Sequence, residues 1–126
     1  MGNMKKKLEL PHEHNDKNIQ EQIVSSLPSA ETIFKVSDAL KQLGDPSRLK
    51  IFWLLCHTEE CVTDIAAMVD MSSPAVSHHL RLLKQADLIV SRREGKEMLY
   101  KASDTELVNE LHRVIETIAS IKCPGK

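Results

Sequence analysis

MSSPAVSHHLRLLKQADLI, residues 71–89, is the segment that decides the fold of this 126-residue chain. Val76, Leu80 and Leu83 recur at the spacing of one face of a helix, and this face is expected to be buried. Either serine before Pro74 can cap the helix, and proline suits a first turn, where its missing N–H is not needed. The segment therefore predicts an amphipathic helix with a defined start.

The opposite face of this helix carries polar side chains. Serine and arginine supply hydrogen-bond donors for base edges and phosphates, and histidine can add a contact to either. Such a face can also meet only water, because most amphipathic surface helices do so. The candidate DNA contacts in this segment are Ser72, Ser73, Ser77, His78, His79 and Arg81.

The flanking segments favour DNA contact. Residues 62–69 show a short helical pattern, and residues 70–72 form the link expected between the two helices of a helix-turn-helix. Downstream, residues 88–93 and 97–101 are typical of strands and are separated by a glycine-containing turn. These segments predict a β-hairpin, or wing. Its candidate DNA contacts are Arg92, Arg93 and Lys96.

Four motifs in order resemble the ArsR/SmtB family of bacterial metal-sensing repressors. They are GDPSR at 44–48, CVTDI at 61–65, SHHL at 77–80 and the hairpin at 92–100. The resemblance covers residues 29–121. It implies a mainly α winged helix-turn-helix fold with a small β-hairpin, a homodimer, and repression of transcription that an inducer relieves.

Composition and charge agree with a small DNA-binding domain. Hydrophobic residues make up 41% of the chain, which fits one domain with a small core. The net charge is only −1, but residues 81–101 hold six basic and three acidic side chains. Residues 103–116 hold four acids and one arginine. We therefore expect a local basic surface near the wing, with the acidic segment turned away from DNA.

The chain has no apolar run long enough to cross a bilayer and no apolar core of a signal peptide. We expect a cytoplasmic protein without a membrane partner. Three cysteines, an odd number, favour reduced thiols over a disulfide framework. Nothing in the sequence indicates an organic cofactor.

Breaker residues divide the chain into three parts. Residues 1–28 are predicted to be a mobile arm with a short helix, residues 29–121 the winged-helix DNA-binding and dimerisation domain, and residues 122–126 a C-terminal tail. A dimer would place two recognition helices one turn of DNA apart, which calls for an inverted-repeat operator of double-stranded DNA.

The last predicted helix begins after a cap at Ser103 or Asp104. Its apolar stripe comprises Leu107, Leu111, Val114, Ile118 and Ile121. The stripe can cover its own subunit or a partner. The resemblance implies that the first and last helices of the domain pair across a two-fold axis.

The resemblance implies metal binding at one or both of two places. One joins the third helix to the N-terminal arm, where the family often carries Cys-Val-Cys-Asp and this chain has CVTD at 61–64. Cys61 and Asp64 lie one helical turn apart, so they can share an ion. The candidate partners in the arm are His12, Glu13 and His14. This mixed sulfur, nitrogen and oxygen set suits zinc or a related divalent ion better than cadmium or lead.

The second place spans the last helices of two subunits, where the family pattern is Asp-x-His followed by His and Glu. Asp104 is kept, but Glu106, Thr117 and Ser120 stand at the other positions, so this site is predicted to be dismantled. His112 matches no family position and is expected to be exposed.

Several alternatives remain open. The His-Glu-His arm can be solvated, and Cys61 can be a small core residue. Cys56 is expected to pack in the core, with His57 and Cys123 as further candidate ligands. A thiol or persulfide sensor, a non-metal inducer and a metal buffer or carrier are the other functions considered. The family positions for persulfide sensing hold Trp53 and Ala119, which disfavours that chemistry.

An enzyme that uses cysteine and histidine is disfavoured. The sequence shows no oxyanion loop, no glycine-rich phosphate cradle and no second pair of acids. We therefore expect a regulator and not a catalyst.

Overall fold

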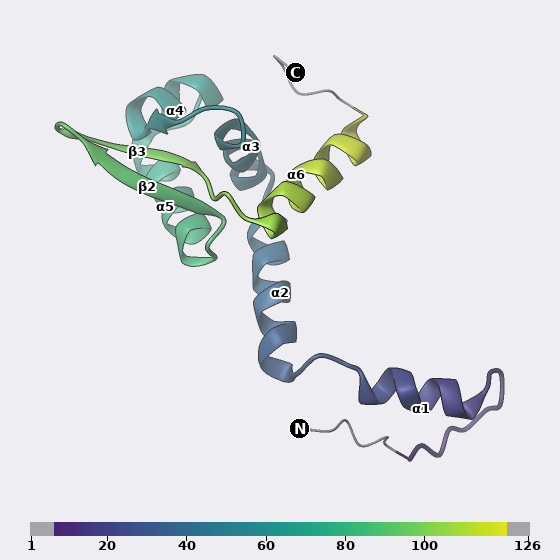
Figure 1. Ribbon diagram of the computed structural model, residues 1–126. Coiled ribbons are helices and arrows are strands. Elements are labelled where there is room, and N and C mark those ends of the chain that lie inside the picture. The colour runs from purple at the N-terminus through teal and green to yellow at the C-terminus, as the bar shows by residue number, and fades with distance from the viewer. Residues whose placement is uncertain (1–6, 121–126) are drawn as a thin grey trace. The chain divides into compact units, whose positions relative to one another are not determined.

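The computed structural model describes residues 7–120 (Figure 1). The described chain divides into two compact units between Phe34 and Lys35. Within these residues, no helix is long and apolar enough to cross a membrane. The elements in chain order are α1 (Lys17–Ser25), α2 (Ala30–Gln42), α3 (Pro46–Leu55), β1 (Glu60–Cys61), α4 (Val62–Val69), α5 (Ser73–Gln85), β2 (Ile89–Glu94), β3 (Glu97–Ala102) and α6 (Glu106–Ala119).

The first unit contains α1, the short helix that the sequence predicts near this position. Asp16 caps it, because the Asn18 amide donates to Asp16 Oδ1 at 2.8 Å. No residue of α1 is buried. The division between the two units falls inside α2, whereas the sequence suggested a boundary after residue 28.

The core of the second unit is built mainly from α3, α4 and α5. Ile51 and Phe52 of α3 and Ile65 of α4 are completely buried. The apolar face predicted for α5 is confirmed, since its three residues all lie in this core. Buried aliphatic side chains therefore hold the outward face of α5 in a fixed orientation.

The helix-turn-helix has the link that its sequence predicts. Asp70 ends α4 in the left-handed conformation, with φ of 56°. Ser72 then caps α5 by accepting a hydrogen bond from the Ala75 amide at 3.3 Å. Of the two candidate serines, Ser72 is the cap, and Ser73 is the first residue of the helix.

The wing belongs to a three-stranded antiparallel sheet with the order β1-β3-β2. Gly95, with φ of +61°, provides the tight turn between β2 and β3, where a side chain would strain the backbone. The sequence predicts this hairpin but not β1, in which Cys61 pairs with Leu99. This pairing places Cys61 beside the middle of β3.

The start of α6 differs from the prediction. Thr105 caps the helix by accepting a hydrogen bond from the Val108 amide at 3.1 Å. The predicted caps, Ser103 and Asp104, are wrong, because Ser103 is buried and its hydroxyl donates to the Asp87 carbonyl at 3.0 Å. Ser103 is therefore needed to close the loop after α5.

The apolar stripe of α6 is only partly covered. Val108 is buried and Leu111 packs against the core. Leu107, Val114 and Ile118 are 52%, 49% and 80% exposed. Ile121, the last member of the predicted stripe, lies outside the described residues. The helix thus has one apolar face against the core and a second that is about half or more exposed in the described part of the chain.

Candidate nucleic-acid interface and metal ligands

The polar face of α5 is exposed as predicted. Ser73, Ser77, His78 and Arg81 all reach solvent. Arg81 Nη2 lies 3.0 Å from His78 Nδ1, and because a guanidinium can only donate, the imidazole nitrogen accepts. The proton of a neutral His78 ring is then on Nε2. The pair thus presents hydrogen-bond donors outward.

His79 is turned away from this face. Its side chain is only 13% exposed, and Nδ1 lies 3.9 Å from Asp45 Oδ2, at the N-terminus of α3. Burial, reinforced by the nearby Arg48 charge, lowers the pKa of His79, and the Asp45 carboxylate only partly opposes this. His79 therefore lies at the junction of α3 with α5. Unlike Ser77, His78 and Arg81, it is not among the exposed side chains of α5 that can contact DNA.

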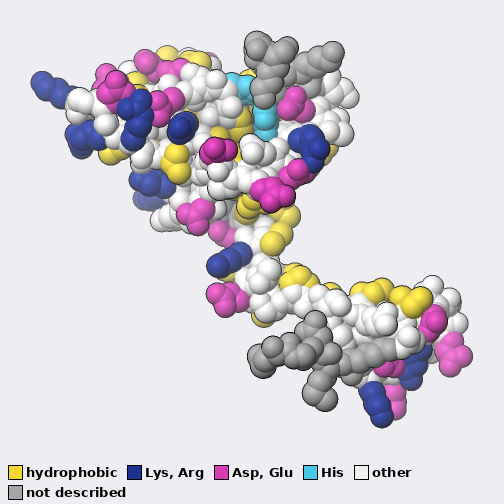
Figure 2. Space-filling view, viewed as in Figure 1, with side chains coloured by type: hydrophobic (Ala, Val, Ile, Leu, Met, Phe, Trp, Pro, Cys, Tyr) yellow, Lys and Arg dark blue, Asp and Glu magenta, His cyan; other side chains and the backbone are white. Residues whose placement is uncertain are grey.

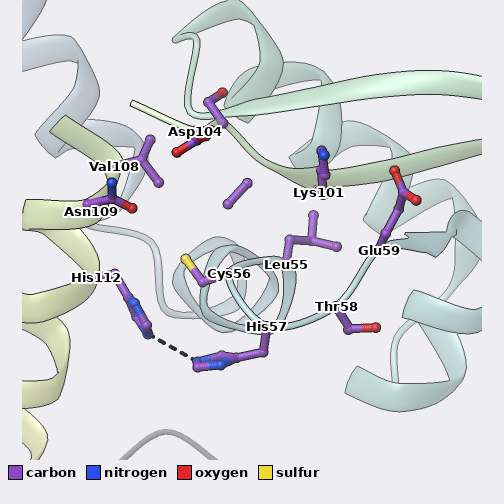
Figure 3. Close-up of a pocket in the computed structure, with 12 residues that line it drawn as sticks. Leu55, Cys56, His57, Thr58, Glu59, Lys101, Asp104, Val108, Asn109 and His112 are labelled. Carbon is purple, nitrogen blue, oxygen red and sulfur yellow. Dashed lines mark hydrogen bonds between the residues drawn. The ribbon is translucent and has the colours of Figure 1, made fainter. Parts of the chain in front are cut away.

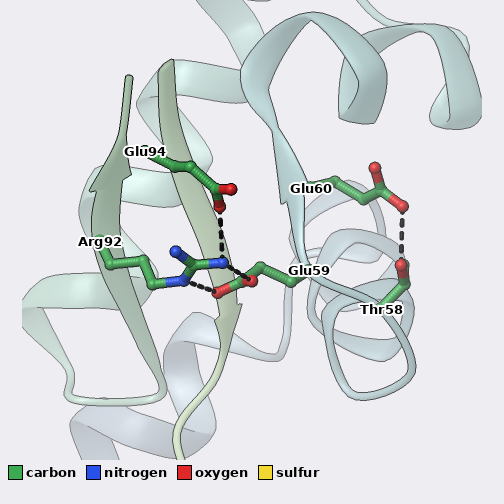
Figure 4. A network of polar contacts seen from close by, with 5 residues as sticks. All are labelled: Thr58, Glu59, Glu60, Arg92 and Glu94. Atoms are coloured by element: carbon green, nitrogen blue, oxygen red, sulfur yellow. Dashed lines mark hydrogen bonds and ion pairs between the residues drawn. The ribbon is translucent and has the colours of Figure 1, made fainter. Parts of the chain in front are cut away.

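The wing carries three basic side chains that differ in their contacts. Arg92 pairs with carboxylates, whereas Arg93 and Lys96 are exposed. Arg92 donates to Glu59 through Nε at 2.9 Å and through Nη2 at 2.7 Å, and Nη2 also lies 2.8 Å from Glu94 Oε2 (Figure 4). The hydrogen bonds from Arg92 hold the pKa of Glu59 below its usual value. Arg92 therefore ties β2 to the segment before β1. Arg93 and Lys96 are exposed and extend from the hairpin.

Basic side chains concentrate where the charge pattern predicted them. Figure 2 shows Lys and Arg side chains over the wing and α5, with Asp and Glu side chains interspersed among them. Lys84 Nζ donates to Ser91 Oγ at 2.6 Å, which links α5 to β2. The recognition helix and wing therefore form one connected surface.

The two halves of the predicted metal site lie in different units of the structure. Cys61 and Asp64 border a hollow of about 370 Å³, together with Lys96, Glu97 and Met98. The Asp64 amide favours the Cys61 thiolate, but burial and the carboxylates of Glu97 and Asp64 outweigh it and raise the pKa of the thiol. Glu97 is an acidic neighbour that the sequence did not reveal, because it reaches Cys61 only through the unpredicted pairing of β1.

The arm residues His12, Glu13 and His14 are exposed. The rings of His12 and His14 stack with centroids 5.5 Å apart. Across residues 7–120, no group of three or more His, Cys, Asp or Glu side chains is already gathered as a metal site. The joining of the arm to Cys61 and Asp64 thus stays a prediction.

A separate pocket lies between the end of α3 and α6 (Figure 3). His112 is not exposed as expected: its side chain is 12% exposed, and its Nε2 lies 3.1 Å from His57 Nε2. The sequence could not show this contact, because the two residues are 55 positions apart. Cys56 also lines the pocket, and its burial is intermediate.

This geometry, an apolar-anchored helix with exposed donors beside a basic β-hairpin, defines a winged helix-turn-helix of the DNA-binding class. The family model described as bacterial regulatory protein, arsR family, matches residues 45–91. These residues span α3, α4, α5 and the start of β2.

Curated relatives extend the match. A transcriptional repressor SmtB homolog from Synechocystis is 33% identical over 95 residues, covering 75% of this chain and 72% of the relative. The transcriptional repressor SdpR of Bacillus subtilis is 34% identical over 83 residues, covering 66% of this chain and 92% of the relative. The cadmium resistance regulatory protein CadC of Listeria innocua is 40% identical over 75 residues, covering 59% and 63%.

Solved structures give the same fold. The homodimeric winged helix-turn-helix domain Mb0332 from Mycobacterium bovis superposes with a TM-score of 0.66 at 30% identity, covering 75% of this chain and 90% of that one. HlyU from Vibrio cholerae superposes with a TM-score of 0.67 at 22% identity, covering 74% of this chain and 100% of that chain. The chain belongs to the ArsR family of bacterial regulatory proteins and is a winged-helix transcriptional regulator.

Proposed function

We propose that this protein is a homodimeric cytoplasmic repressor that binds an inverted-repeat operator and releases it when a metal ion binds. The observation that carries the proposal is α5, whose apolar face is buried while Ser77, His78 and Arg81 remain exposed. Repressors among the relatives and the homodimeric structural neighbour support the same function.

In this proposal α5 enters the major groove. Arg81 and His78 direct donors at base edges, and Ser73 and Ser77 lie nearer the start of the helix, where recognition helices approach the bases. Arg93 and Lys96 contact phosphates from the wing, and such contacts fix the position on DNA without reading its sequence. Arg92 instead positions the hairpin, because its guanidinium is engaged by two carboxylates.

Dimerisation is proposed to cover apolar side chains that remain exposed. Leu107, Val114 and Ile118 form the outer face of α6, and α2 also exposes Ile33, Phe34, Val36 and Leu40. Solvent-exposed aliphatic and aromatic groups on two helices lower their free energy by packing against a second copy. Two copies related by a two-fold axis would present two α5 helices to one face of DNA.

The proposed inducer is zinc or a related divalent ion held by Cys61, Asp64 and the arm residues His12, Glu13 and His14. A thiolate, a carboxylate and imidazoles form a donor set that zinc accepts. Since the pKa of Cys61 is raised, ion binding must displace the thiol proton, so affinity should fall with acidification. Release of DNA requires the ion to favour the weakly binding conformation, on the usual scale of about 1–3 kcal/mol.

The decisive experiment is a fluorescence anisotropy titration of reduced protein with operator DNA, with and without Zn²⁺, Cd²⁺ and Co²⁺. Cys61→Ser and deletion of residues 1–15 are each expected to preserve DNA binding by the metal-free protein and to blunt its response to zinc. Thr117→Ala is the control, because the family's second site is not retained at this position.

The same titration separates the competing functions. Full zinc-induced release by the Cys61→Ser dimer would contradict the proposed ligand set. Stoichiometric metal binding with unchanged DNA affinity would instead favour a metal buffer. Release by a persulfide donor, without any response to metal, would identify a thiol sensor.

A further inference from the structure

Two imidazoles, one in the turn after α3 and one in α6, meet in the pocket between these helices. His57 follows the end of α3, and His112 lies in the middle of α6. Their Nε2 atoms are 3.1 Å apart, with the rings nearly perpendicular at 74° (Figure 3). The His57 ring also packs on Trp53, with centroids 4.4 Å apart, so its orientation is supported from behind.

The separation of the two nitrogens has a chemical consequence. A neutral pair can share one proton in an N–H···N hydrogen bond, but two protonated rings would repel each other. When both neutral rings carry their proton on Nδ1, both Nε2 atoms have lone pairs, and rotation of the rings would direct them at one ion. With zinc–nitrogen bonds of about 2.0–2.1 Å and tetrahedral angles, two imidazole nitrogens stand about 3.3 Å apart, close to the separation found here.

A carboxylate stands beside the pair. Glu116 follows His112 by one helical turn, and its Oε1 lies 3.6 Å from His112 Nε2. Residues at i and i+4 on a helix share a face and can ligate one ion. No three such side chains are gathered in residues 7–120, so Glu116 must move to complete the set by changing its rotamer.

We propose that His57, His112 and Glu116 contribute ligands to a second binding site for a divalent ion of the zinc class. Imidazole and carboxylate ligands suit Zn²⁺ and Co²⁺. The site differs from the one at Cys61 in its residues and in the elements that carry them. Its ligands connect α3, which packs on the recognition helix, to α6, which bears the exposed apolar face. A role of this site in regulation rests on the proposed function, because an ion here would couple α6, the proposed dimerisation helix, to α5, the proposed recognition helix.

The test is metal binding by full-length reduced protein in a Cys61→Ser background, which removes the thiolate of the other site. Co²⁺ absorption and Zn²⁺ competition against a chelating indicator measure affinity. One ion per chain is expected to remain. The substitutions His57→Gln and His112→Gln are each expected to lower the affinity for this ion by about 10- to 100-fold. Loss of residues that only support a metal site already has an effect on this scale.

Matched carboxylate variants sharpen this test. Glu116→Gln is expected to lower the metal affinity several-fold. Glu110→Gln should leave the metal affinity unchanged, because Glu110 pairs with the exposed Arg113 away from the pocket. Zinc should also shift the ¹⁵N resonances of both His57 and His112 rings. Circular dichroism confirms that each variant is folded before its affinity is compared.

Two results would overturn the site. One is loss of all metal binding in the Cys61→Ser protein, with no zinc-induced shift of either imidazole. The other is unchanged affinity after His57→Gln and His112→Gln in that background. Operator release is measured separately on the protein with Cys61 intact, because metal binding there with no effect on DNA would contradict the proposed function and leave the site in place.

Discussion

Helices α5 and α6 carry similar amphipathic patterns but bury them differently. In α5, Val76, Leu80 and Leu83 are all at most 2% exposed. In α6, only Val108 is buried to that extent, while Val114 and Ile118 are about half and four-fifths exposed, at 49% and 80%. An apolar stripe thus shows that a helix needs a partner, but it does not show whether the partner lies in the same chain.

The surroundings explain this difference. Helix α5 is enclosed by α3, α4 and β2, so its apolar face is covered on several sides. Helix α6 contacts the core through Val108, Leu111 and Ile115 and turns another apolar face outward. Mutations on the apolar face of α5 should therefore act on folding, and mutations on the outer face of α6 should act on association.

The largest effect is expected from Leu80→Ala. Leu80 is 2% exposed, and removing its side chain leaves a cavity in the core. The free energy of unfolding should fall by about 2–5 kcal/mol, measured by urea denaturation at fixed protein concentration. A loss below about 1 kcal/mol would mean that the core collapses around the site or that the enclosure of α5 is incomplete.

Val114→Glu should separate association from folding. A charge on the outer face of α6 is expected to weaken the dimer by about 2 kcal/mol or more, because a buried interface would have to desolvate it. Sedimentation equilibrium measures the dimer constant, and circular dichroism should show an unchanged fold. Arg113→Gln is the control on a neighbouring face. A dimer of wild-type strength would place the interface elsewhere.

Within the DNA-facing surface, α5 and the wing should differ in kind. Arg81→Ala is expected to cost about 1–3 kcal/mol on the cognate operator and to relax its base preference. Arg93→Ala should weaken all sequences equally and lower the slope of log affinity against log salt by about one unit. Anisotropy titrations on cognate and scrambled DNA at several salt concentrations distinguish the two. Equal specificity after Arg81→Ala would contradict the groove assignment.

The smallest effect is a pH dependence from His79, the polar residue on the inner side of α5. Because burial lowers its pKa, the unfolded chain takes up a proton near pH 6.5 that the folded state resists. Stability should therefore fall as the pH drops from about 7 to 5, and the decrease should be shallower in His79→Gln. Thermal melts of both proteins across this range measure the difference. Parallel curves would show that the ring is not desolvated.

Local patterns predicted α5 and the wing, the elements that we propose to contact DNA. The spacing of Val76, Leu80 and Leu83 located α5, and the glycine turn located the wing because such turns need a backbone that glycine adopts freely. The pairing of Cys61 with Leu99 had no local signal, since β1 contains only two residues. The cap of α6 was missed because Ser103, a plausible cap by residue type, instead donates its hydroxyl to the carbonyl of Asp87 in the turn after α5.

The sequence by itself determined the helix-turn-helix and the wing, because these depend on side-chain periodicity and turn chemistry over short distances. The family followed from the resemblance of four short motifs that occur in order along the chain. Only the tertiary structure decided that Arg92 is held by Glu59, that His79 faces Asp45 and that His57 meets His112. The physical reason is that hydrogen bonds and ion pairs act over a few ångströms in space. Which groups come that close depends on how the whole core packs, and separation along the chain does not reveal it.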